Sequence, residues 1–163
     1  MDHVAMVMEQ WARERPDLDV SPQAVIARLH RLALRLTEEL VAGYARHGLT
    51  EAEFDILASL RRQGPPYALP AGDLAAQTMV TSGAITKRVD RCVERGWVTR
   101  SVSEQDARGR VIALTDRGRE LIDRAFADHI ANEHRLLASF GERDRATLAR
   151  LLRAWAEELD GAS

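Results

Sequence analysis

Apolar residues recur at steps of three and four over most of the chain, which predicts a largely helical protein. Proline, glycine and capping residues divide this pattern into separate helices. Ser21 and Pro22 predict the N-cap and the first position of one helix. The starts of three others are predicted at Thr50, Thr81 and Thr115. The predicted helices cover residues 2–14, 22 to 43 or 48, 50–63, 71–77, 82–95, 115–139, and a last segment after Phe140 and Gly141.

The spacing changes after Gly96. Trp97 to Ser103 reads as a strand, residues 104–109 as a polar turn and Arg110 to Leu114 as a returning strand, since Ile112 and Leu114 alternate with smaller or polar neighbours. The segment from Tyr67 to Pro70 is too short for more than one extended step. The expected fold class is therefore mainly α with a small β-hairpin (α+β).

Two short helices followed at once by a hairpin describe a winged helix-turn-helix, in which the second helix enters the DNA major groove and the hairpin is the wing. We expect one domain over residues 1–163, with a DNA-binding lobe at 50–115 and helical dimerisation regions at 1–48 and 116–163. The C-terminal leucines exceed what a small lobe can cover, which favours a homodimer, although they could instead complete the core of a monomer.

Composition narrows the class of protein. Of 163 residues, 45% are hydrophobic but only 5% aromatic, so aliphatic side chains must build the core. No apolar run approaches the roughly 20 residues of a membrane helix, and no signal peptide follows Met1, so a soluble cytoplasmic protein is expected. A single cysteine, Cys92, excludes an internal disulfide and a thiolate zinc site.

Charge is unevenly distributed, although the formal net charge is only −2. Residues 81–112 carry Lys87 and six arginines against four acidic residues, a net of +3 between two acidic flanks. Since phosphate contacts are local, the charge of this segment, and not the net charge of the whole chain, decides whether DNA is a plausible partner. With Ile85, Val89 and Cys92 facing inward, the predicted double-stranded DNA contacts are Thr81, Ser82, Gly83, Thr86, Lys87 and Arg91, with Arg108 and Arg110 on the wing.

These residues resemble the MarR family of bacterial transcriptional regulators. The resemblance rests on the string from Thr81 to Arg91, on Glu94 to Val98, and on the wing pattern from Asp106 and Arg108 through Leu114-Thr115-x-x-Gly118, and it extends over residues 22–160. It implies a homodimer, most simply a repressor, on a pseudo-palindromic operator, released by a small ligand or, in some members, by cysteine oxidation.

The N-terminal segment resembles a urate-responsive, PecS-like subgroup of that family. The resemblance implies a ligand site with Trp11 and Asp55, and an arginine that is Arg61, Arg62 or Arg88; Arg88 is taken here as the candidate. A urate-like or phenolic anion would stack on the indole and pair with the guanidinium. The plainer alternative is that Trp11 anchors the first helix and Asp55 makes a local cap.

Other functions have less support. Five histidines show no i,i+4 pair, so no metal site or other cofactor is expected, and Cys92 on an inward row reads as an inert thiol. No nucleophile motif, phosphate loop or inward carboxylate pair suggests an enzyme. The remaining alternative is a winged-helix protein–protein interaction module that does not bind DNA.

Overall fold

The computed structural model describes residues 2–78, 82–102 and 109–161. The chain divides into two compact units, Met1–Glu51 and Ala52–Ser163. The boundary falls at the start of the third helix, so each unit is described by itself.

The first unit consists of α1 (His3–Glu14) and α2 (Gln23–Ala45). Asp2 joins the two helices, because its carboxylate accepts a hydrogen bond from Ala5 N at 2.7 Å and another from Arg28 Nε at 2.8 Å. The hydrogen bond from Arg28 is the main cause that lowers the pKa of Asp2 to about 2. One acidic side chain thus both caps α1 and pairs with α2.

The predicted N-cap of α2 is wrong. The capping position is occupied by Pro22, with no side-chain cap hydrogen bond. The Ser21 hydroxyl instead donates to Asp19 at 3.0 Å, and Asp19 also accepts from Ser21 N at 2.9 Å. A nearby carboxylate competes for the serine, as short polar side chains do in turns.

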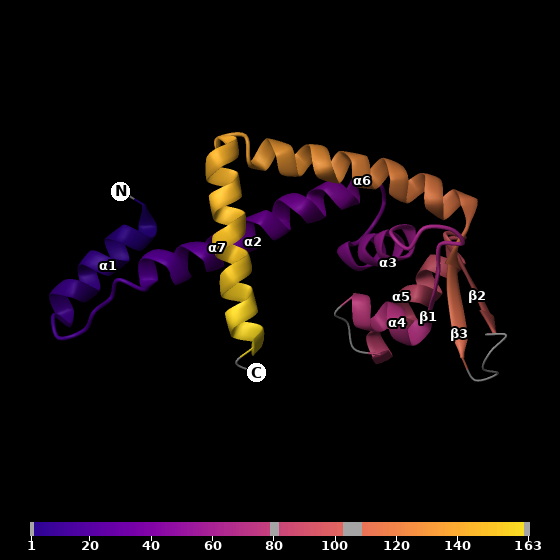
Figure 1. Cartoon of the computed structure of the whole chain (residues 1–163), viewed down its shortest axis with the longest axis horizontal. Coiled ribbons are helices and arrows are strands. Elements are labelled where there is room, and N and C mark those ends of the chain that lie inside the picture. The colour runs from indigo at the N-terminus through magenta and orange to yellow at the C-terminus, as the bar shows by residue number, and fades with distance from the viewer. Residues whose placement is uncertain (1, 79–81, 103–108, 162–163) are drawn as a thin grey trace. The chain divides into compact units, whose positions relative to one another are not determined.

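The second unit carries the remaining elements (Figure 1). They are α3 (Glu51–Arg61), β1 (Ala68–Pro70), α4 (Ala71–Gln77), α5 (Ser82–Glu94), β2 (Val98–Val102), β3 (Arg110–Leu114), α6 (Asp116–Leu136) and α7 (Glu142–Gly161). The structure confirms the predicted α+β class and, to within a few residues, the predicted helix and hairpin bounds. In Figure 1, α3 lies between α6 and the pair α4 and α5.

The sheet has three strands rather than the two of the predicted hairpin. Its antiparallel order is β1-β3-β2, with Leu69 opposite Ile112 and Arg100 opposite Ile112 on the other side. The three residues of β1 are too few for an alternation to show in sequence. Its pairing depends on β3, whose last residue extends the contact when Leu114 N donates to Tyr67 O at 3.1 Å.

The core of the second unit is aliphatic, as the composition predicted. Side chains with almost no exposed area come from α3, α4, α5, both hairpin strands and α6: Ile56, Leu57, Leu60, Leu74, Cys92, Val98, Ile112 and Ile122. Two large apolar residues of α6 and α5 lie outside this core, because Phe126 is 48% and Val93 is 39% exposed. Large apolar side chains are also exposed along α2 and α7. None of the described helices is long and apolar enough to cross a membrane.

The end of α5, the wing and the start of α6 meet at one backbone junction. After α5 the chain turns through Gly96, at φ +70°, and Gly96 N and Trp97 N donate to Val93 O and Cys92 O, the two bonds of a Schellman cap. The Thr115 hydroxyl donates to Gly96 O at 2.8 Å and accepts from Gly118 N at 3.0 Å. The Thr115-x-x-Gly118 pattern is thereby explained, since the threonine caps α6 and fixes it to the turn.

Gly118 is required at this junction because a Cβ there would overlap the backbone of Trp97. We expect Gly118→Ala to lower the free energy of unfolding by about 1–3 kcal/mol, since the helix and the turn cannot both keep their positions. Urea denaturation followed by far-ultraviolet circular dichroism measures this change. Gly141→Ala is the matched control, because a Cβ at Gly141 meets nothing within 4 Å; equal stability of the two variants would contradict the close approach.

Candidate nucleic-acid interface

Helix α5 has one buried and one exposed face, and Thr86, Lys87 and Arg91 of the predicted DNA contacts belong to the exposed one. Ile85 and Val89 are buried, whereas Thr86 and Lys87 are exposed. Ser82 and Gly83 lie in the first turn of the helix, and Thr81 is outside the described residues. The face therefore presents an exposed cationic side chain in the second turn of the helix, where it is available to phosphate oxygens.

Arg91, another of the predicted contacts, is held by an acidic residue of another helix. Its Nη2 atom lies 3.3 Å from Glu53 Oε1 of α3, and the side chain is 55% exposed. Glu53 is only 1% exposed, although it lies in the first turn of α3. No periodicity signal marks a buried glutamate, so the pair was missed.

Asp90, the residue before Arg91, connects α5 to the wing. Arg100 Nη2 on β2 lies 2.7 Å from Asp90 Oδ1, and the two side chains are 32% and 47% exposed. Adjacent residues of α5 are thus paired in two directions, Asp90 with β2 and Arg91 with α3. The Asp90–Arg100 pair is partly exposed, and ion pairs of this kind contribute little stability singly.

Of the two predicted wing arginines, the structure describes one. Arg110 is the first residue of β3 and is exposed, and its Nη1 donates to Gly109 O at 3.1 Å. Arg108 and Asp106 lie outside the described residues.

Cys92 lies against the buried side of α5, as predicted. It has no exposed area, and burial, followed by the charge of Glu53, raises the pKa of its thiol to about 12. Because the thiolate is the reactive form, almost none is present near neutral pH.

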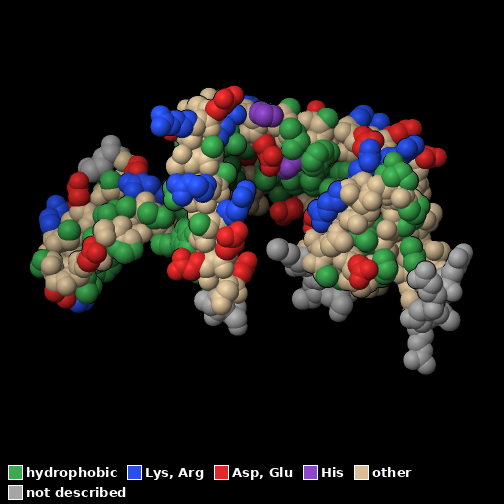
Figure 2. All heavy atoms as spheres, viewed as in Figure 1, with side chains coloured by type: hydrophobic (Ala, Val, Ile, Leu, Met, Phe, Trp, Pro, Cys, Tyr) green, Lys and Arg blue, Asp and Glu red, His purple; other side chains and the backbone are tan. Residues whose placement is uncertain are grey.

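A hollow of about 440 Å³ lies between α3 and α6 and was not predicted. It is lined by Ala58, Arg61, Arg62, Ile122, Asp123 and Phe126. Figure 2 shows hydrophobic side chains gathered below α6, beside a histidine. The ring contacts agree, since the His129 ring lies 5.1 Å from Phe54 and 5.8 Å from Phe126, measured between centroids.

The two arginines of this hollow have different surroundings. Arg61 Nε donates to Asp123 Oδ1 at 2.7 Å, and the guanidinium also lies over the Tyr67 ring. Arg62 is exposed and makes one long hydrogen bond, 3.4 Å from Nη2 to Gln77 Oε1. Of the two, Arg62 is the one whose charge is directed to solvent rather than to a carboxylate.

The predicted ligand residues are distributed over both units. Trp11 is 48% exposed on α1 in the first unit, while Asp55 on α3 and Arg88 on α5 are half-buried in the second. Their grouping in one site stays a prediction. Among the described residues, no cluster of three His, Cys, Asp or Glu side chains could hold a metal ion.

Comparisons with known proteins agree with this architecture. A model of the MarR family matches residues 47–109. The HTH-type transcriptional regulator PecS of Dickeya dadantii is 40% identical over 149 residues, which are 91% of this chain and 90% of that protein.

Solved structures with a similar fold include two regulators of Streptomyces coelicolor. AbsC, a MarR family transcriptional regulator, has a TM-score of 0.76 and 26% identity over 88% of this chain and 98% of its own. Sco3205, a MarR family regulator solved in complex with DNA, has a TM-score of 0.78 and 25% identity over 87% and 89% of the two chains.

The buried position of Cys92 gives a prediction about its chemistry. We expect the thiol to resist Ellman's reagent between pH 7 and 9 in the folded protein and to react rapidly in 8 M urea, since only unfolding removes the burial that keeps it protonated. Labelling is followed by absorbance at 412 nm. Rapid labelling without denaturant would show that the thiol is accessible and would revive a redox role.

Proposed function

Because the chain belongs to the MarR family of transcriptional regulators, we propose that it is a homodimeric repressor that binds a pseudo-palindromic operator and is released by a small aromatic anion. The observation that carries the proposal is the exposed Lys87 face of α5, fastened to α3 on one side and to the wing on the other. A fixed cationic helix next to a wing supports insertion into a major groove.

The charge distribution supports two copies on one duplex. A single lobe offers few cations in a chain whose net charge is −2, and non-specific affinity falls steeply with salt when phosphate contacts are few. Joining two lobes doubles the contacts and selects half-sites roughly 34 Å apart. We therefore propose residues 50–115 as the DNA-binding lobe and 1–48 with 116–163 as the dimerisation region.

The exposed leucines of α2 and α7 support that division. Among them Leu32 is 55%, Leu151 is 53% and Leu159 is 58% exposed in the isolated chain. Apolar area of this extent is normally covered, and a two-fold contact between copies covers it without further partners.

The hollow between α3 and α6 supports the effector part of the proposal. Phe126 and Ile122 offer an apolar wall for a ring, and Arg62 offers a guanidinium for an anionic group. A ligand there would act by favouring a spacing of the two lobes that does not fit the operator. By resemblance, Trp11, Asp55 and Arg88 also remain candidate ligand residues.

Binding to a mixed-sequence 30-base-pair duplex across a salt series tests the DNA part. We expect Lys87→Ala to weaken binding. We also expect the slope of log K against log salt to become less steep by about 0.9 per copy, since binding releases fewer counterions when one phosphate contact is lost. Fluorescence anisotropy measures both quantities.

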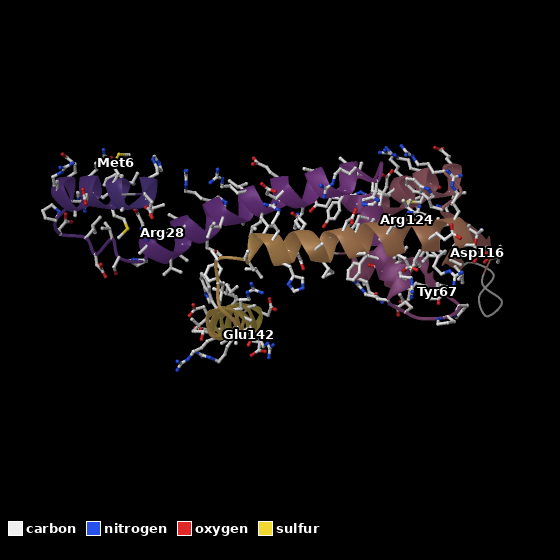
Figure 3. All side chains as sticks on the ribbon, turned by 90° about the horizontal axis from the view of Figure 1, so that it is seen from above. Met6, Arg28, Tyr67, Asp116, Arg124 and Glu142 are labelled. Atoms are coloured by element: carbon white, nitrogen blue, oxygen red, sulfur yellow. The ribbon has the colours of Figure 1, made fainter. Side chains whose placement is uncertain are left out.

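The control is Arg124→Ala, which removes the same charge from the exposed side of α6 (Figure 3) and should leave affinity and slope unchanged. If the wild-type chain binds no duplex even at low salt, the protein-interaction module is the better interpretation.

Arg62→Gln tests the effector part. We expect this variant to bind DNA normally but to require at least about tenfold more urate or salicylate for release, because a charge-assisted hydrogen bond to the anion is lost. Release is read from the same anisotropy assay. Arg61→Gln is the comparison, since Arg61 is already paired with Asp123; an equal loss in both variants would place the anion elsewhere or show that the hollow has collapsed.

A further inference from the structure

Glu53 is a charged side chain in a place where charges are rarely found. It is 1% exposed, within the first turn of α3, and its neighbours in the same helix include the core residues Phe54 and Leu57. Removing a carboxylate from water is costly unless an opposite charge and hydrogen bonds compensate. Its position therefore requires a cationic partner.

Arg91 supplies that partner from α5. Nη2 of Arg91 lies 3.3 Å from Oε1 of Glu53, and the charge of Glu53 also reaches the next residue, since it helps to raise the pKa of the Cys92 thiol. The pair thus joins the C-terminal half of α5 to the first turn of α3. A guanidinium that stays beside Glu53 is directed back toward the protein.

The second ion pair of α5 holds the neighbouring residue to a different element. Asp90 pairs with Arg100 of β2 at 2.7 Å. Residues 90 and 91 are about 100° apart around the helix axis. Two pairs at this angle resist rotation of α5 about its own axis, which neither would do alone.

We propose that Glu53 and Arg91 are positioning residues that fix the rotation of α5, and that Arg91 is not a DNA contact. The inference rests on the proposed function, because the rotation of α5 decides where Lys87 meets the duplex. It also revises the sequence-based assignment of Arg91 to a base edge or phosphate.

Whether Glu53→Gln tightens or weakens DNA binding distinguishes a positioning role from a purely electrostatic effect. Glu53→Gln removes a negative charge close to α5 and frees Arg91, so electrostatic attraction alone predicts tighter DNA binding. If the pair positions α5, the same variant binds the mixed-sequence duplex roughly tenfold more weakly, since α5 loses its ion pair with α3. Tighter binding by Glu53→Gln would overturn the inference.

The salt slope provides a second, independent criterion. Arg91→Gln should weaken binding to a similar extent without changing the slope, whereas loss of a phosphate contact lowers it by about one per copy, as expected for Lys87→Ala. Arg91→Lys keeps the charge beside Glu53 and should restore most of the affinity. A reduced slope for Arg91→Gln would show that Arg91 contacts phosphate.

Cys92 reports on the same pair without DNA. It is the single cysteine of the chain, is fully buried and directly follows Arg91, so its labelling rate by Ellman's reagent measures how often this part of α5 opens. We expect labelling to be at least about tenfold faster in Glu53→Gln and Arg91→Gln, and unchanged in Arg91→Lys and Lys87→Ala.

The two measurements separate the inference from the proposed function. A wild-type chain that binds no duplex, with faster labelling in Glu53→Gln, would leave the helix restraint standing and remove the DNA-binding role. If the wild type binds the duplex, and if Glu53→Gln and Arg91→Gln change neither the labelling rate nor the affinity, the DNA-binding role stands and the helix restraint is removed. If Glu53→Gln does not fold, Arg91→Gln decides, because it alters the half-exposed partner.

Discussion

The close approach of α6 to the turn after α5 is the constraint on which the arrangement of the second unit depends. Three elements are joined within a few residues, because the carbonyl oxygens of α5 bond the turn, the turn accepts from Thr115, and Thr115 caps α6. Gly118 makes this possible, since any side chain there would meet the backbone of Trp97. Local backbone geometry therefore fixes how the wing leaves α5, in addition to the aliphatic core that both share.

Ion pairs add an orientation to that position. The hydrophobic row of α5 fixes which side is buried, but aliphatic packing is weakly directional and permits small rotations. Asp90 and Arg91 oppose these rotations, because Asp90 pairs with the wing and Arg91 pairs with α3. Charged residues of α5 thus have separate surroundings, with Lys87 exposed and Asp90 and Arg91 paired within the chain.

Most of the fold follows from the sequence, and the site follows in part. Helix bounds are readable because the apolar period and the caps coincide, as at Thr115, while Ser21 misled because Asp19 lies two residues away. Strand β1 was not predicted to pair, since its three residues depend on β3. The Glu53–Arg91 pair and the hollow between α3 and α6 join residues far apart in the chain, and neither leaves a local signal.

The chain has 22 arginines but one lysine, and that lysine stands on the exposed face of α5. Acylating reagents that modify primary amines therefore have a single side-chain target here, besides the amino terminus. Coupling the protein to a surface or a dye through amines would place the attachment on the helix proposed to enter the groove. Amine modification of this protein therefore probes one side chain. Protection of that amine by bound duplex would report contact at Lys87 alone.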